Sequence, residues 1–362
     1  MKKFSKTRYF PPERLIHEYQ PYAEKYPLEP IGKSVEGRSI YAITIGQGSK
    51  RILAWSQMHG NETSTTRALL KLMNELTSQN RTALLEEITL KVIFQLNPDG
   101  SQMYTRENAV QADLNRDARL QQQPETKALM NVFKSFAPDL CLNLHGQRTI
   151  FAAGKQSLPA ALSFLSPSAD STKAITPARL TAMQLIASIA DGFSDRKHWE
   201  IGRYDDGFNA NCTGDYFTAK GVPTVLFEAG HYPYDYDRNK TTELIHRALL
   251  HVLLAYADNS YLDYSAEDYS SIPENEKSCC DVAVELITNV NNDETTKSLH
   301  FVQFREVLMD GSIAFMPEYI EGQTYKQFHA KLDLSLPKRE KAIFFDDLAK
   351  NVVQWVKKHQ HS

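Results

Sequence analysis

Short apolar segments of strand length alternate with longer segments of helical period over the first 258 residues. The strand-like segments are Ser39–Ile45, Arg51–Gln57, Leu90–Leu96, Leu140–Leu144 and Thr224–Phe227. The helical patterns are Ser64–Leu76, Glu125–Phe136, Pro177–Ala190 and Thr242–Ala257. This alternation predicts an α/β fold, with a mixed, mostly parallel sheet flanked by helices on both faces and with the first two segments as adjacent strands.

The pattern changes after residue 258. Residues 261–292 are rich in Ser, Asp, Glu and Asn and have little periodicity. Beyond them, Phe301–Phe315 predicts a hairpin that turns at Asp310-Gly311, and Phe344–Lys357 predicts an amphipathic helix. We therefore divide the chain into an α/β domain at 1–258, a linker or irregular surface segment at 259–295, and a small C-terminal α+β extension at 296–362.

Charge and cysteine content narrow the class of protein. The chain has 41 basic and 44 acidic residues, a net charge of -3 and no long block of one sign, which favours a peptide or small-molecule partner over nucleic acid or a membrane. The basic N-terminus is followed by proline and charge instead of the apolar run of a secretory signal. Four cysteines without a C-x-x-C pair suit reduced thiols, so we expect a soluble cytoplasmic protein.

Two polar residues, His59 and Glu62, stand three apart where the segment Arg51–Gln57 passes into the following helix. Gly60 lies between them and allows an unusual backbone, so that both side chains can point at one centre. Imidazole and carboxylate are ligands of catalytic zinc, which takes a third protein ligand and keeps one position open for water. The spacing alone also arises by chance in a chain with eleven histidines.

Two later strand-like segments also end in polar residues. His145 follows Leu140–Leu144, and Glu228 follows Thr224–Phe227. The carboxyl ends of parallel strands meet at one edge of a sheet, which is where active sites gather. Because a buried charge without a partner is costly, metal coordination or pairing is the usual reason for such residues.

Taken together, the motifs resemble the zinc carboxypeptidase family. The similarity covers roughly Ile31 to Ala257, and the spacing from Asn97 to Arg116 is most similar to the bacterial branch, which includes murein peptide amidases. It rests, in chain order, on His59-x-x-Glu62, Asn97-Pro98-Asp99-Gly100, Arg106-x-Asn108-Ala109, Asp113-Leu114-Asn115-Arg116, Leu144-His145 and Phe227-Glu228.

The resemblance implies one Zn²⁺ ion held by His59, Glu62 and His145, with Glu228 as the general base. Zinc lowers the pKa of a water molecule toward neutrality, and a nearby carboxylate can accept its proton. Arg106 would then stabilise the oxyanion that develops on the substrate carbonyl. The resemblance also implies that residues 1–258 form a zinc carboxypeptidase-like catalytic domain.

Further residues of the matched pattern are implied in substrate binding. Asn115 and Arg116 would bind the terminal carboxylate, since a guanidinium matches that planar anion. The tyrosine with which the family covers its substrate is best matched by Tyr204, although another register places Phe208 there. The Asn97–Gly100 turn is expected to be structural and to orient the loop that carries Arg106.

The predicted function is a zinc metallopeptidase that hydrolyses an amide next to a free C-terminal carboxylate, in peptides or cell-wall-derived peptides. Asp205, Asp206 and Asp215 would suit a cationic side chain on the substrate. One alternative is an N-acyl amino acid deacylase of the succinylglutamate desuccinylase or aspartoacylase type, which uses a similar metal site. The other is a catalytically silent relative that binds peptides, against which the presence of Glu228 argues.

Overall fold

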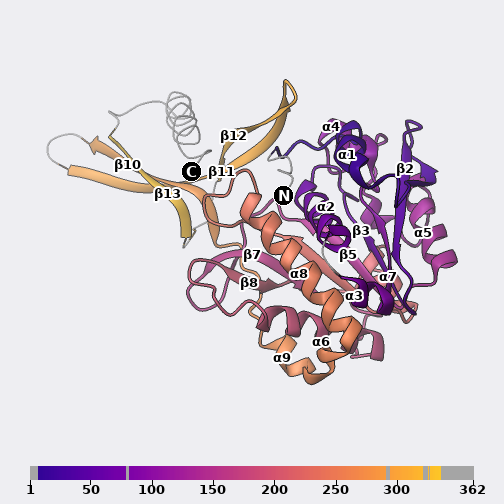
Figure 1. Ribbon diagram of the computed structural model, residues 1–362. Helices are drawn as coiled ribbons and strands as arrows, with labels where there is room; N and C mark the ends of the chain where they lie inside the picture. Colours follow the sequence, from indigo (N-terminus) through magenta and orange to yellow (C-terminus); the bar gives the residue numbers. More distant parts are fainter. Residues whose placement is uncertain (1–6, 79–80, 291–293, 321–324, 326, 336–362) are drawn as a thin grey trace.

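In the computed structural model, which describes residues 7–78, 81–290, 294–320, 325 and 327–335, the strands form two separate sheets (Figure 1). The larger sheet has nine strands, and β8 (Glu200–Arg203) pairs with β7 beside the main path. The order of that path is β1 (Glu29–Lys33), β2 (Ser39–Gly46), β4 (Ile88–Ile93), β3 (Lys50–Trp55), β5 (Leu140–Gly146), β9 (Thr224–Ala229), β7 (Leu158–Leu165) and β6 (Ala152–Ala153).

The centre of this sheet is parallel and its flanks are antiparallel. Strands β4, β3, β5 and β9 run in one direction, whereas β1, β2, β7 and β6 pair antiparallel with their neighbours along the main path. Beside that path, β8 pairs parallel with β7. The mixed sheet that the sequence predicts is confirmed. The prediction that β2 and β3 are adjacent is wrong, because β4 lies between them. The link from β2 to β3 crosses the start of β4, where the Gly48 amide donates to the Ile88 carbonyl.

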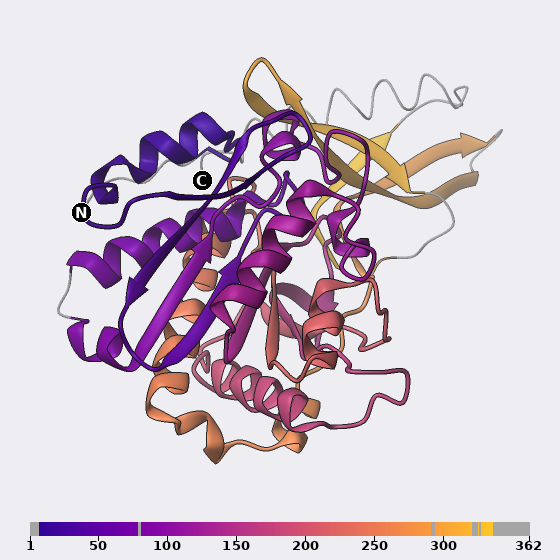
Figure 2. The ribbon, with the colours of Figure 1, turned by 90° about the vertical axis from the view of Figure 1, so that its right-hand side faces the viewer.

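Helices cover both faces of the sheet, as predicted. One face packs against α1 (Pro12–Tyr19), α2 (Thr63–Ser78), α3 (Thr82–Glu87), α6 (Pro177–Asp191) and α8 (Asn239–Asp258). The other packs against α5 (Pro124–Phe136) and α7 (Thr213–Ala219). Figures 1 and 2 show the two layers, and strand residues alternate between them, with Ala54 facing the first core and Trp55 the second. Among the described helices, none combines the length and apolar character needed to cross a bilayer.

The second sheet projects from one side of the α/β body (Figure 1). Its order is β12 (Ser312–Ile320), β11 (Glu294–Met309), β10 (Cys279–Val290) and β13 (Gln327–Ser335). The hairpin predicted at Asp310-Gly311 is confirmed, with positive φ angles of 48° and 72° at its two turn residues.

The segment 259–295 is not irregular throughout, contrary to the prediction. It contains η3 (Ser260–Asp263), α9 (Ala266–Ser270) and β10, in which Val282, Ala283 and Val284 are all buried. A strand covered on both faces lacks the alternation of apolar and polar residues that marks a strand in a sequence. The predicted helix Phe344–Lys357 lies outside the described residues, and the three-part division of the chain stays a prediction.

A close backbone contact shapes the turn between β3 and α2. A Cβ atom on Gly60 would lie 1.9 Å from the Gly100 carbonyl carbon and 2.2 Å from the Ser101 nitrogen. These atoms belong to α4 (Pro98–Met103), which Asn97 caps by accepting from the Gly100 amide at 2.8 Å. Gly60 has no positive φ, so the expectation of an unusual backbone is wrong, and the glycine is required by the approach of α4.

We expect Gly60→Ala to lower the free energy of unfolding by about 1–3 kcal/mol or more, because backbone atoms must move to admit the methyl group. Chemical denaturation measures the change. Gly221→Ala is the matched control, since Gly221 has a φ of +83° and nothing within 4 Å of its would-be Cβ atom, so that only conformational strain is added. An equal or smaller loss for Gly60→Ala than for the control would contradict the packing argument.

Candidate metal centre

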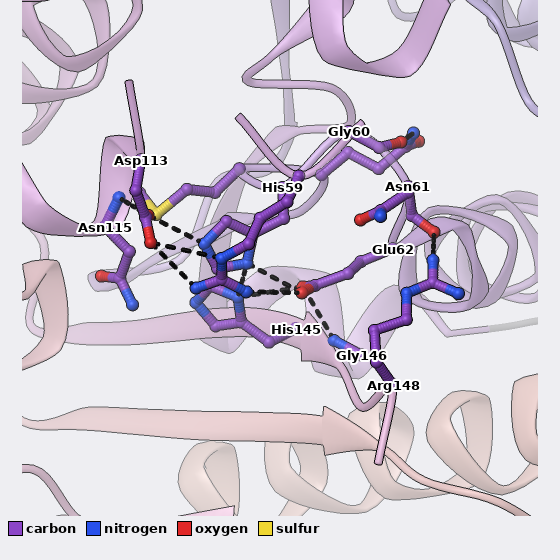
Figure 3. A network of polar contacts seen from close by, with 12 residues as sticks. His59, Gly60, Asn61, Glu62, Asp113, Asn115, His145, Gly146 and Arg148 are labelled. Atoms are coloured by element: carbon purple, nitrogen blue, oxygen red, sulfur yellow. Dashed lines mark hydrogen bonds and ion pairs between the residues drawn. The ribbon is translucent and has the colours of Figure 1, made fainter. Parts of the chain in front are cut away.

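His59, Glu62 and His145 converge on one point at the carboxyl ends of β3 and β5 (Figure 3). Nδ1 of His59 lies 2.8 Å from Glu62 Oε1, Nδ1 of His145 lies 3.1 Å from Glu62 Oε2, and the two Nδ1 atoms are 3.1 Å apart. All three side chains are buried. The Gly146 amide also donates to Glu62 Oε2 at 2.9 Å, which ties the carboxylate to the end of β5.

Asp113 orients the ring of His59. Its Oδ1 lies 3.1 Å from His59 Nε2 and can accept the proton of that nitrogen, so that Nδ1 is the ring atom that faces Glu62 and His145 and could bind a metal. Metal-ligating histidines are commonly fixed by a carboxylate in this way. Sequence reasoning gave Asp113 no role, although its position in the Asp113–Arg116 motif was a usable signal.

The donor set fits a cation such as zinc. Ligand atoms about 2.0–2.2 Å from a tetrahedral zinc ion lie roughly 3.3–3.5 Å apart, and the three contacts here are shorter by only a few tenths of an ångström. Although burial opposes the charged ring, the carboxylates of Glu62 and Asp113 raise the pKa of His59 to about 9. The same concentration of negative charge that retains a proton would attract a metal ion.

Glu228 stands beside the cluster. It is the register partner of His145 in the parallel pair β5 and β9, so both side chains leave the same face of the sheet. Burial, together with the negative charge of Glu62, holds the pKa of Glu228 well above its usual range. The strand ends therefore bring the predicted base next to the three predicted ligands.

Arg106 reaches the same centre from the loop after α4. Its Nη2 and Nε atoms donate to Asp113 Oδ2 at 3.0 and 3.2 Å, and its Nη1 lies 3.6 Å from Glu62 Oε1. The Asn97 side chain donates to the Arg106 carbonyl at 3.4 Å, in agreement with the expectation that the Asn97–Gly100 turn orients this loop.

Asn115 and Arg116 lie on η2 (Leu114–Arg116), directly after Asp113. Asn115 Oδ1 accepts from the Thr213 amide at 3.0 Å. The exposed Arg116 side chain donates to the Asn115 carbonyl at 2.8 Å and lies 3.1 Å from Cys212 Sγ. Both residues are thus at the rim of the cluster, with the Arg116 guanidinium open to solvent.

Tyr204 is placed near Glu228 by the end of β8. Burial and the Glu228 carboxylate both raise the pKa of its hydroxyl, which also contacts the Gln147 side chain. The ring packs edge-on against Phe151, with 5.3 Å between centroids. Tyr204 thus interacts electrostatically with Glu228, and its role in the site stays a prediction.

The three aspartates do not form one group. Asp206 is paired with Arg179 and with Lys173, and Asp205 accepts from the Gly207 amide of its own turn at 2.6 Å. Asp215 is buried, and burial raises the pKa of its carboxyl to about 6. Asp206 is thus already neutralised, so the expectation that all three suit a substrate cation is not supported at that position.

Comparison with known proteins finds a family similarity in the N-terminal part. The family model described as "Zinc carboxypeptidase" matches residues 15–118, a stretch that includes His59, Glu62, Arg106, Asn115 and Arg116. Residues 15–118 are therefore similar to the zinc carboxypeptidase family. His145 and Glu228 lie beyond this match, and their assignment rests on the geometry above. No particular branch of the family is singled out.

Individual relatives agree with this family assignment. Mouse carboxypeptidase M is 33% identical over 155 residues, covering 35% of each chain, so the chain spans about a third of the length of the curated relative. A metallo-carboxypeptidase from Burkholderia cenocepacia has a TM-score of 0.54 at 17% identity and covers 69% of this chain and 70% of its own. One from Pseudomonas aeruginosa, in complex with (2-guanidinoethylmercapto)succinic acid, has a TM-score of 0.53 at 20% identity, covering 69% of each chain. The α/β body has the carboxypeptidase fold.

We expect His145→Ala to lose bound zinc, because it removes one of three ligands and leaves the other two on one short turn. Elemental analysis after equilibration with zinc and dialysis measures the metal content. His251→Ala is the control, since His251 lies on α8, away from the cluster, and its ring contacts Ser188 Oγ of α6 at 3.1 Å. Full zinc retention by His145→Ala would exclude this residue as a ligand.

Proposed function

We propose that the protein is a zinc metallopeptidase that hydrolyses the amide bond next to a free C-terminal carboxylate. The observation that carries the proposal is the convergence of two imidazoles and a carboxylate beside a fourth acidic side chain, Glu228, at the carboxyl edge of the sheet. A single zinc ion would be held by His59, Glu62 and His145. The four free cysteines favour the cytoplasm as its location.

Zinc would supply Lewis acidity at the scissile carbonyl and would make a water molecule more acidic. Residues of the chain would then transfer the proton and stabilise the negative charge that forms on the substrate. Glu228 would take the proton of the attacking water and pass it to the leaving amine. The positive charge of a bound zinc ion would offset the burial and the Glu62 charge that raise the pKa of Glu228, and would so favour the carboxylate that this role needs. Arg106, already within 3.6 Å of Glu62, would shift a short distance to stabilise the oxyanion.

Substrate binding is proposed for Asn115, Arg116 and Tyr204. The exposed Arg116 guanidinium could bind the terminal carboxylate of a peptide through two parallel hydrogen bonds. Tyr204 would cover the bound substrate on the side of Glu228. Cell-wall-derived peptides carry such a carboxylate. The carboxyl of Asp215 interacts electrostatically with Arg116, and we therefore propose Asp215 as the candidate that would bind a cationic group of the substrate.

A panel of N-acyl amino acids and of peptides two to five residues long separates the proposal from the deacylase alternative. A peptidase should gain in kcat/KM as residues are added, because additional contacts contribute binding energy that acts in the transition state. Amidation of the C-terminus should abolish the gain. Turnover confined to the shortest N-acyl amino acids would instead favour the deacylase.

We expect Glu228→Gln to lower kcat by about 10²–10⁴-fold while zinc stays bound, because the amide keeps the shape of the side chain but cannot accept the proton. Steady-state kinetics and elemental analysis of the same preparation give both quantities. Full activity of the variant would remove Glu228 as the base. A wild-type protein that binds zinc yet cleaves no member of the panel would favour the silent, peptide-binding alternative.

A further inference from the structure

The four-stranded sheet meets the α/β body at a buried carboxylate, Glu306 of β11. The Glu306 side chain is only 7% exposed. Its cross-strand partner is Phe315, which packs with Phe304 against Tyr236 of the α/β body at centroid distances of 5.3 and 5.7 Å. Apolar surroundings strengthen the electrostatic contacts of a charged group that is fully paired.

Three side chains from the α/β body reach this one carboxylate. Arg8 Nη1 lies 2.5 Å from Glu306 Oε1, the Tyr104 hydroxyl donates to Oε2 at 2.7 Å, and Arg148 Nη1 forms an ion pair with Oε2. The three residues belong to three segments that are far apart in the sequence. Each of them is connected to a residue of the candidate metal centre, Arg148 and Tyr104 along the chain and Arg8 through a hydrogen bond from Thr63.

Arg148 connects Glu306 to the turn that carries two of the ligands. It lies three residues after His145, and its Nη2 donates to the Asn61 carbonyl at 2.5 Å, as Figure 3 shows. Asn61 immediately precedes Glu62. One planar guanidinium therefore links the carboxylate of the second sheet to the turn of Glu62.

Arg8 secures the other side of Glu62. The Thr63 hydroxyl donates to the Arg8 carbonyl at 2.7 Å, and Thr63 is the first residue of α2. The backbone on both sides of Glu62 is thus held by residues that pair with Glu306.

Tyr104 connects Glu306 to the loop of Arg106. Tyr104 ends α4 with a positive φ of 56°, two residues before Arg106. The intervening Thr105 carbonyl accepts from the Asn61 amide at 3.0 Å. The loops of Glu62 and Arg106 are therefore fastened both to each other and to the second sheet.

We propose that Glu306 is a positioning residue for the metal centre, acting through Arg8, Tyr104 and Arg148 on the loops that carry Glu62, Arg106 and His145. The four-stranded sheet then contributes, through Glu306, to the geometry of the metal centre. The inference deepens the proposed function and rests on it for the identity of the metal. Loss of the Glu306 charge would leave the buried Arg8 guanidinium without its carboxylate, so that the loops would shift to hydrate or re-pair it.

A second contact between the sheet and the body supports the same role. The Tyr236 hydroxyl lies 2.9 Å from Oδ1 of the buried Asp281 of β10. Two residues later, Arg238 donates to the Gln147 carbonyl at 2.9 Å and to the Gly230 carbonyl. The strand ends after His145 and Glu228 are thus bridged by the segment that Asp281 anchors.

The test compares Glu306→Gln with wild type in the full chain. We expect the zinc dissociation constant, measured by competition with a chromophoric chelator, to rise severalfold, up to about the tenfold effect seen when a direct partner of a metal ligand is lost, because Glu306 acts on the ligands only through their loops. The visible absorption of the Co²⁺-substituted protein should also shift, well below the melting temperature, because it reports the geometry of the ligands. Glu318→Gln is the matched control, since Glu318 is exposed and pairs with Arg305 within the same sheet.

An unchanged dissociation constant and an unchanged Co²⁺ spectrum in Glu306→Gln would overturn the positioning role. If that variant does not fold, Arg148→Lys decides, because lysine keeps the charge but cannot contact both Glu306 and the Asn61 carbonyl with a planar fork. The same rise is expected there, and its absence overturns the proposal. Wild-type protein that binds zinc but cleaves no peptide would remove only the proposed function, whereas wild-type protein without zinc affinity would remove both.

Discussion

The structure depends on one concentration of negative charge and lone pairs at the carboxyl ends of β3 and β5. The Nδ1 atoms of His59 and His145 and the carboxylate of Glu62 lie within about 3 Å of one another. Asp113 contacts the other ring nitrogen of His59, Nε2. Such a group is unfavourable unless a proton or a metal cation lies within it. The Gly146 amide fixes Glu62 and the Asp113 carboxylate fixes His59, so that these side chains are held in place.

The fold holds the side chains of the metal centre on short segments at the carboxyl edge of the large sheet. His145 and Glu228 are adjacent in the register of two parallel strands, so their spacing is fixed by backbone hydrogen bonds and not by loops. His59 and Glu62 lie on a turn, and that turn is fixed by the close packing of Gly60 on Gly100. Sites on strand ends tolerate little displacement, which suits chemistry that needs groups placed to within a fraction of an ångström.

The central strands and the metal ligands could be predicted because each leaves a local signal. β3, β5 and β9 are apolar runs that end in a polar residue, and the helices between them have a clear period. β7 (Leu158–Leu165) escaped notice because its Ala, Ser and Pro content has weak strand propensity, and β10 because both of its faces are covered. Asp113 stands in a matched motif, but its contact with His59 is a tertiary one that the motif does not reveal. Glu306 is a solitary acidic residue within a strand and carries no local sign of its partners.

The pairing of Arg8 with Glu306 joins the beginning of the described chain to its last sheet. On a ribosome the metal ligands emerge long before the strand that braces them, so the α/β body can collapse while its reactive edge is still loosely held. The centre would then reach its final geometry only after translation of the C-terminal sheet. A nascent or prematurely terminated chain would in this way carry His59, Glu62 and His145 without the sheet that holds their loops in place.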